Sequence, residues 1–248
     1  MLNQARKFFT LLLVCLWCLG FLSDASPALA DVSQQLEKQV LSIIRNHPEA
    51  IIESVQEYQR QQQQEQEKQQ KAVLQQMKVD PQAFIGDSPT RGSRDEKIVL
   101  FMFSDFQCPF CAVANETVKE FMDIYGDRVT LVYKHLPLSI HPQAPGAAKA
   151  AYAAGQQGRF WQYYDSLFAH QKELGEELYR ELAEELDLDL EQFDRNRNSA
   201  AAREAIAADV KLAQSLLIQG TPFFALNGKS LSGAVPLKTF ESALKGEI

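Results

Sequence analysis

The chain has 248 residues, and its 46% hydrophobic and 23% charged residues are ordinary proportions for a globular protein. Its formal net charge of -7 at pH 7 argues against a general nucleic-acid binder, because such a protein normally presents a basic face to phosphates. We therefore expect no nucleic-acid partner. The length fits one large domain, or a smaller domain with an additional segment.

Residues 1–30 are laid out like a secretory signal peptide. Arg6 and Lys7 make a short positive start, an uncharged apolar run follows from Phe8 to Leu22, and the stretch ends on Ala28-Leu29-Ala30. We expect cleavage near Ala30 and export to the periplasm or an equivalent extracytoplasmic space. The alternative is an uncleaved anchor, although the apolar run is shorter than the roughly 20 residues that a spanning helix needs.

Residues 31–80 are predicted to be helical. Apolar residues recur at spacings of three and four, and Asn46-His47-Pro48 interrupts the pattern before a second helix and a glutamine-rich stretch begin. This segment has too little apolar surface for a core of its own. We expect it to form a homo-oligomer with other copies of the chain, and the alternative is a solvated helical spacer.

The turn-rich composition of residues 81–96 predicts a linker. From Lys97 the pattern changes to a continuous apolar strand, a helix that ends near Tyr125 and a second strand, which together predict a right-handed βαβ unit. Helical patterns fill about residues 143–219. A strand at 223–226, an Asn227-Gly228 turn, a returning strand and a last helix follow.

This order predicts an α/β thioredoxin-like fold over residues 97–248, with a helical insertion and a preceding N-terminal helical segment. Its chemistry centres on cysteine. Cys15 and Cys18 fall inside the predicted signal peptide, so only Cys108 and Cys111 remain after cleavage. Cys108 follows a buried strand at the start of a helix, where unpaired N–H groups and the helix dipole favour a thiolate.

We expect Cys108 and Cys111 to form a redox-active disulfide. Cys108 acts as the nucleophile, and Cys111, one helical turn further on, attacks the mixed disulfide and releases the substrate. Pro109 suits the first helical turn, where its missing N–H costs no hydrogen bond. A zinc site needs about four ligands, and without a second cysteine pair or a histidine cluster in the mature chain we expect no metal and no cofactor.

Three stretches of the chain resemble the DsbA-like thiol–disulfide oxidoreductases, over about residues 95–248. They read Phe103-Ser104-Asp105-Phe106-Gln107-Cys108-Pro109-Phe110-Cys111, Lys134-His135-Leu136-Pro137-Leu138 with His141-Pro142, and Gly220-Thr221-Pro222-Phe223-Phe224. The resemblance implies that Cys108 is the exposed nucleophile and Cys111 the resolving thiol. It also implies that Pro222 is a cis-proline facing the cysteines, with Thr221 and Pro222 binding an extended substrate.

The N-terminal helices, around Asn46-His47-Pro48-Glu49-Ala50-Ile51-Ile52, resemble those of the suppressor-of-copper-sensitivity DsbA-like proteins. Some relatives of that kind are trimeric and shuffle disulfides. The resemblance implies cysteine-containing exported proteins as substrates, and a membrane or periplasmic redox partner.

Two departures from the family pattern concern the tuning of the cysteine pair. Phe110 stands where the strongly oxidising members have a histidine, so we predict a less acidic Cys108 and a less oxidising protein. Met102 stands where related proteins often carry an acidic residue. Asp105 is nearer to the cysteines, and we expect it to be a loop or cap residue rather than a proton relay. Lys134, His135 and His141 either lie near the site or belong to a solvated loop end, and both readings stay open.

The predicted activity is therefore that of an exported thiol–disulfide oxidoreductase, of oxidase or isomerase type, that forms or reshuffles disulfides in secreted proteins. One alternative is a dedicated reductase for a specific target. The other is a non-enzymatic oligomeric holdase that works through its N-terminal helices. The direction of the exchange is left open.

Overall fold

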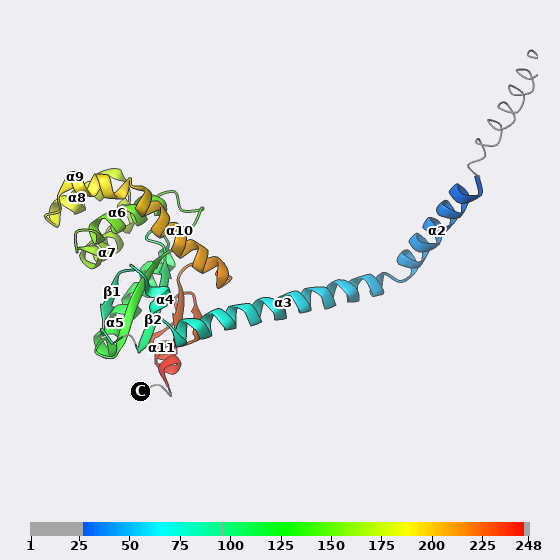
Figure 1. Ribbon diagram of the computed structural model, residues 1–248, viewed down its shortest axis with the longest axis horizontal. Helices are drawn as coiled ribbons and strands as arrows, with labels where there is room; N and C mark the ends of the chain where they lie inside the picture. Colours follow the sequence, from blue (N-terminus) through cyan, green and yellow to red (C-terminus); the bar gives the residue numbers. More distant parts are fainter. Residues whose placement is uncertain (1–26, 96, 246–248) are drawn as a thin grey trace, which may run out of the picture. The chain divides into compact units, whose positions relative to one another are not determined.

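The computed structural model describes residues 27–95 and 97–245, with side chains from Gln34 onward. The predicted signal peptide lies outside this range apart from its last four residues. The chain divides into two compact units, one ending at Gln63 and the other beginning at Gln64 (Figure 1). Within the described part of the chain, no helix combines the length and the apolar character that crossing a bilayer requires.

The first unit is helical, and its apolar side chains are exposed. Helix α2 (Pro27–Asn46) ends and α3 (Pro48–Val79) begins at the predicted interruption. Nine large apolar side chains of the unit are between 41% and 62% exposed: Leu36, Val40, Leu41, Ile43, Ile44, Ile51, Ile52, Val55 and Tyr58. The unit therefore has no core of its own within the described residues.

The second unit contains a five-stranded sheet in the order β1-β3-β2-β4-β5. Strands β2 and β3 are parallel and are joined by helix α5, whereas the other neighbouring strands are antiparallel. This arrangement confirms the predicted βαβ unit and the thioredoxin-like fold. The bounds are β1 (Thr90–Gly92), β2 (Ile98–Ser104), α5 (Pro109–Tyr125), β3 (Val129–His135), β4 (Phe223–Leu226) and β5 (Lys229–Ser232).

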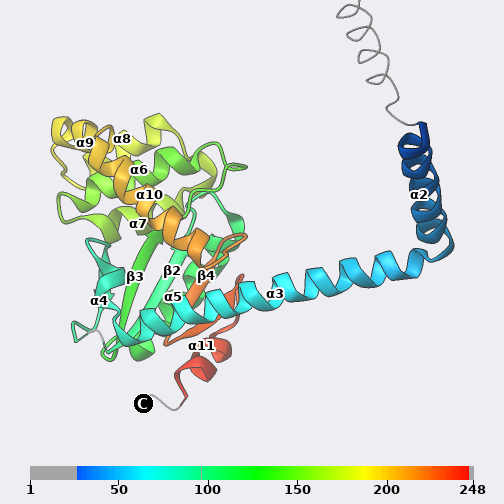
Figure 2. The ribbon, with the colours of Figure 1, turned by 45° about the vertical axis from the view of Figure 1, so that its right-hand side comes forward.

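A group of helices lies between β3 and β4 in the chain, within the stretch predicted to be helical. Helices α6 to α9 gather beyond one end of the sheet, and α10 runs from this group back along it (Figures 1 and 2). The bounds are α6 (Ala144–Gly155), α7 (Phe160–Ala169), η1 (Gln171–Glu173), α8 (Glu176–Glu185), α9 (Leu190–Arg197) and α10 (Ala200–Ser215), with α11 (Leu237–Leu244) after the sheet.

Both faces of the sheet are buried, as the continuous apolar run of β2 predicted. Leu100 and Met102 join a core with α5, the inserted helices and α11. Val99, Phe101 and Phe103 point to the opposite face, where they form a second core with residues of α3 and α10. Figure 2 shows α3 and α10 lying across this face of the sheet. The alternation of side chains along a strand explains this division.

The predicted linker, residues 81–96, is wrong. This stretch contains helix α4 (Gln82–Ile85) and strand β1, which pairs with β3 at the edge of the sheet. The predicted boundary before residue 97 is also too late, because Leu74 and Met77 of α3 are buried against the sheet. A three-residue edge strand is too short to produce a recognisable hydrophobic alternation in the sequence.

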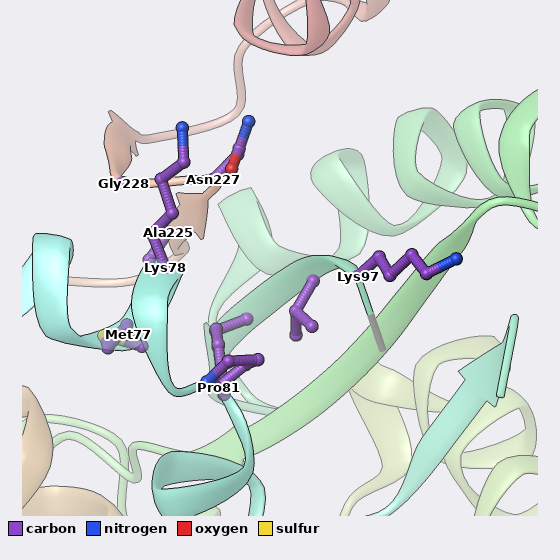
Figure 3. Close-up of a pocket in the computed structure, with 9 residues that line it drawn as sticks. Met77, Lys78, Pro81, Lys97, Ala225, Asn227 and Gly228 are labelled. Atoms are coloured by element: carbon purple, nitrogen blue, oxygen red, sulfur yellow. The ribbon is translucent and has the colours of Figure 1, made fainter. Parts of the chain in front are cut away.

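A small cavity separates the end of α3 from the β4–β5 hairpin (Figure 3). Met77 and Pro81 line one side of it, and Ala225, Asn227 and Gly228 line the other. Its volume of about 10 Å³ has room for about one water molecule. It is therefore too small for a substrate or a cofactor. Asn227 and Gly228 both have positive φ, of 54° and 78°, as the predicted hairpin turn requires.

A buried ion pair connects β3 to α10. The Lys134 ammonium lies 3.1 Å from an Asp209 carboxylate oxygen, and the residues are only 5% and 7% exposed. The other Asp209 oxygen accepts the His135 backbone N–H at 2.8 Å, and Lys134 also donates to Ser88 Oγ at 2.7 Å. Burial raises the pKa of Asp209, while Lys134 acts in the opposite direction.

We predict that Asp209→Asn lowers the free energy of unfolding by about 3–5 kcal/mol, because it leaves a buried ammonium without a counter-charge. Urea denaturation monitored by circular dichroism measures this change. The control is Glu191→Gln, which removes the partner of Arg195 in an exposed pair and changes the free energy by less than about 1 kcal/mol. Equal losses in the two variants would contradict the prediction.

Candidate redox site

Cys108 lies at the junction predicted from the sequence, as the last of four residues that lead from β2 into α5. It is the N-cap of α5, with an extended backbone at φ -72° and ψ 120°, and Pro109 occupies the first helical position. Its carbonyl oxygen accepts the N–H of Cys111 at 3.0 Å and that of Ala112 at 3.3 Å. The Cys108 sulfur is thus placed beside the positive end of the helix dipole.

Both cysteines are free thiols, and both are buried. The Cys108 thiol donates to the Thr221 carbonyl oxygen at 3.4 Å, and the Asp105 backbone N–H donates to Cys111 Sγ at 3.5 Å. Cys108 is 3% exposed, so the expectation of an exposed nucleophile is wrong for this conformation. The physical reason is that its sulfur packs against the segment before β4.

That segment contains the predicted cis peptide bond, between Thr221 and Pro222. The antiparallel pairing of β4 with β2, in which Phe223 lies opposite Phe103, brings this bond to the cysteines. The Thr221 hydroxyl is buried and has no hydrogen-bond partner among the described residues. Thr221 and Pro222 therefore lie where the resemblance placed them, beside Cys108.

The two thiols have opposite acid–base behaviour. A hydrogen bond with the Cys111 thiol is the main cause that lowers the pKa of Cys108 from 9.0 to about 5, while burial opposes the shift. For Cys111, burial is the main cause of the shift, and it raises the pKa above its ordinary value. Above pH 9 the Cys108 thiolate fully stabilises the reduced fold, and this contribution is lost as the pH falls through about 5.

Asp105 is more than the loop or cap residue that the sequence predicted. Its Oδ1 accepts the Gln107 N–H at 2.7 Å, which is a cap-like contact. Its Oδ2 accepts the Leu138 N–H at 2.8 Å and lies 2.7 Å from His141 Nδ1. The carboxylate is fully buried, and it ties the loop before Cys108 to the loop after β3.

Of the three basic residues that the sequence singled out, His141 is the one that binds the Asp105 carboxylate. Lys134 pairs with Asp209. The His135 ring lies among Phe106, Tyr133 and Phe160, and burial lowers its pKa to about 3. A neutral His135 is thus part of the aromatic core.

Gln171, which follows α7, is a further residue of the site that was not predicted from the sequence. Its side-chain amide donates to the carbonyl oxygens of Phe106 and Cys108 at 2.8 and 2.9 Å, so it fastens the cysteine loop from the side of the inserted helices. No local signal identifies this residue, because its partners lie more than sixty positions earlier in the chain.

Large apolar side chains are exposed on the first turns of α5 and on the loop that contains His141. Phe110 is 64% exposed between them, and Val113, one turn further along α5, is 61% exposed. Ile140, which precedes the Asp105 partner His141, is 77% exposed.

Among the described side chains, no three His, Cys, Asp or Glu residues are grouped so as to hold a metal ion.

A family model for the DSBA-like thioredoxin domain matches residues 99–245. The chain therefore belongs to the DsbA-like thioredoxin-domain family, whose members are thiol–disulfide oxidoreductases.

Solved structures agree with this assignment. A thioredoxin-like oxidoreductase from Silicibacter pomeroyi is 29% identical with a TM-score of 0.60, covering 64% of this chain and 91% of its own. A linker-deletion variant of ScsC from Proteus mirabilis is 20% identical with a TM-score of 0.65, covering 84% and 93%. The thiol-disulfide exchange protein alpha-DsbA2 from Wolbachia pipientis is 20% identical with a TM-score of 0.64, covering 72% and 96%. The last two share the fold.

Curated relatives carry a different name. The Na(+)/H(+) antiporter NhaA 3 of Salinispora tropica is 38% identical over 155 residues, which is 62% of this chain and 24% of the antiporter. The antiporter NhaA of Herminiimonas arsenicoxydans is 34% identical over 155 residues, 62% of this chain and 25% of the antiporter. The chain thus spans about a quarter of the length of these relatives, and the shared segment has the size of one domain.

We predict that the hydrogen bond from Cys111 is what makes Cys108 acidic. In wild type, thiolate absorbance near 240 nm should titrate with a midpoint of about pH 5. Cys111→Ala removes the donor, so the midpoint should rise by at least one pH unit toward the ordinary thiol range, near 8.5. Cys111→Ser keeps an O–H donor at the same place, so its midpoint should stay nearer to wild type. Identical midpoints in the Ala and Ser variants would refute this assignment.

Proposed function

We propose that this protein is an exported thiol–disulfide oxidoreductase that forms or reshuffles disulfide bonds in secreted proteins through Cys108 and Cys111. The observation that carries the proposal is the placement of the two cysteines in the first turn of α5, with Cys108 Sγ 3.4 Å from the Thr221 carbonyl oxygen beside the cis peptide bond; the opposite pKa shifts of the two thiols agree with it. An acidic Cys108 is a thiolate at neutral pH and is also a good leaving group. Cys111 remains a protonated thiol and attacks only after a mixed disulfide has formed at Cys108.

In the oxidising direction, a substrate thiolate attacks Cys108 Sγ in the Cys108–Cys111 disulfide, and Cys111 leaves. A second substrate cysteine then attacks the substrate sulfur of the mixed disulfide, which forms the substrate disulfide and releases the Cys108 thiolate. In the isomerising direction, the Cys108 thiolate attacks a wrong substrate disulfide. Cys111 provides the escape by attacking Cys108 Sγ if the substrate does not rearrange.

The acidity of Cys108 supports a moderately oxidising protein. A pKa of about 5 lies between roughly 3.5 for the strongly oxidising DsbA and roughly 7 for thioredoxin. Phe110 is consistent with this, because its ring cannot stabilise a thiolate as a histidine can. An intermediate acidity suits both formation and reshuffling of disulfides, and the redox state maintained by a membrane or periplasmic partner selects between them.

The surroundings of the cysteines support unfolded, cysteine-containing polypeptides as substrates. Phe110, Val113 and Ile140 offer exposed apolar contacts, which match the apolar side chains that an unfolded chain presents. The Thr221-Pro222 segment, directly before β4, is suited to pair with extended substrate backbone beside Cys108. Both features favour substrates of varied sequence.

Whether redox exchange is the activity is tested by Cys108→Ser with two probes, reduced ribonuclease and ribonuclease with scrambled disulfides. In a glutathione buffer, wild type should speed the recovery of ribonuclease activity from both. With the Cys108→Ser variant, ribonuclease activity should recover no faster than in the buffer alone, because the variant lacks the attacking sulfur. Full activity in this variant would favour a holdase and defeat the redox proposal. Reduction of the probes without recovery would favour a dedicated reductase.

We also propose that the helical segment of residues 31–80 joins copies of the chain into a homo-oligomer. Its support is the set of exposed apolar side chains on α2 and on the first turns of α3. An amphipathic helix without a partner in its own chain gains stability by burying that face against an identical one.

Light scattering on the mature protein tests the oligomer. Ile43→Glu combined with Ile52→Glu places charges on two side chains that are 60% and 57% exposed, so the mass should fall to that of one chain. The control combines Gln61→Glu with Gln69→Glu on α3 and should keep the wild-type mass. A wild-type mass equal to one chain would rule out the oligomer.

A further inference from the structure

The release of a trapped substrate raises a problem at Cys111. Cys111 must attack as a thiolate, yet it is 2% exposed and burial raises its pKa. A buried anion needs hydrogen-bond donors that are already in place. The Asp105 backbone N–H is such a donor, at 3.5 Å from Cys111 Sγ. The behaviour of Cys111 therefore depends on what holds the Asp105 backbone.

The Asp105 side chain itself provides that hold. It spans the short loop through the Gln107 N–H, and it reaches the loop after β3 through the Leu138 N–H and His141 Nδ1. The Asp105 carbonyl also accepts the Cys108 N–H at 3.1 Å. Turning the Asp105 N–H away from Cys111 would break several of these bonds at once.

His141 completes the arrangement. The Asp105 carboxylate is fully buried, and such a group requires donors for its lone pairs. The His141 side chain is 17% exposed. The His141 backbone N–H donates to the Leu138 carbonyl oxygen at 3.0 Å, which closes a turn. The Gln143 N–H donates to Gln107 Oε1 at 2.6 Å, which joins the same two loops a second time.

We infer that Asp105 and His141 are a positioning pair, which holds the Asp105 N–H against Cys111 and thereby sets how fast Cys111 releases a trapped substrate. This inference rests on the proposed disulfide exchange. In the step concerned, the Cys111 thiol loses its proton to solvent and its sulfur attacks Cys108 Sγ. The Cys108–Cys111 bond forms, the Cys108–substrate bond breaks, and the substrate leaves as a thiolate that takes up a proton.

The test separates the two chemical steps in single-turnover experiments with a disulfide-linked peptide as the probe, quenched in acid and followed by mass spectrometry. Asp105→Asn keeps one acceptor oxygen but turns an amide NH₂ toward a donor, either the Leu138 or the Gln107 N–H. We expect release by Cys111 to slow about tenfold, as for the loss of a hydrogen bond to a charged group. Attack by Cys108 should change less than about twofold.

Matched variants complete the test. Glu49→Gln makes the same carboxylate-to-amide change in an exposed pair, where Oε1 lies 3.0 Å from His47 Nδ1, and should leave both steps unchanged. His141→Phe removes the donor to Asp105 and should slow release, whereas His141→Gln keeps an N–H donor and should restore part of the rate.

The outcomes separate this inference from the proposed function. Wild-type release rates in Asp105→Asn, or in His141→Phe if Asp105→Asn does not fold, would overturn the positioning role while leaving disulfide exchange intact. An equal slowing of both steps would also overturn it, because a general loosening of the fold predicts that result. A wild-type protein that forms no mixed disulfide would instead overturn the proposed function.

Discussion

The approach of Cys108 Sγ to the Thr221 carbonyl oxygen is the contact around which the site is arranged. The two residues are 113 positions apart in the chain, and 3.4 Å separates their atoms. Pairing of β4 with β2 creates this proximity, although the helices α6 to α10 separate β4 from β3 in the chain. The sheet thus provides the frame of the site, and the inserted helices add to it through Gln171, which binds the carbonyl oxygens of Phe106 and Cys108.

Within that frame, a hydrogen bond and burial give two chemically identical side chains opposite pKa shifts. Cys108 sits at a helix start and receives a donor from Cys111, so its thiolate is stabilised. Cys111 lies one turn deeper, where burial favours the neutral thiol. In the proposed exchange, attack and release therefore fall to different sulfurs. Phe110, between the two cysteines, carries no positive charge, so these contacts alone account for the lowered pKa of Cys108.

Two buried carboxylates hold the chain where β3 ends. Asp209 of α10 accepts the backbone N–H of His135, and Asp105 accepts that of Leu138. Each carboxylate also has a basic side chain from the same stretch of chain, Lys134 for Asp209 and His141 for Asp105. Buried charges of this kind are costly unless they are fully paired, so they fix one arrangement of this stretch. Asp105 also belongs to the loop before Cys108, so its hydrogen bonds hold this loop in place as well.

The sequence by itself determined the features that depend on neighbouring residues. The C-x-x-C pair after a buried strand, the helix break at Pro48 and the turn at Asn227-Gly228 follow from local spacing and backbone preference. The three matching stretches also sufficed to identify the family and the fold. Only the tertiary structure decided that Cys108 is buried, that His141 rather than His135 reaches Asp105, and that the supposed linker contributes an edge strand. These depend on contacts between distant segments, for which a local pattern contains no signal.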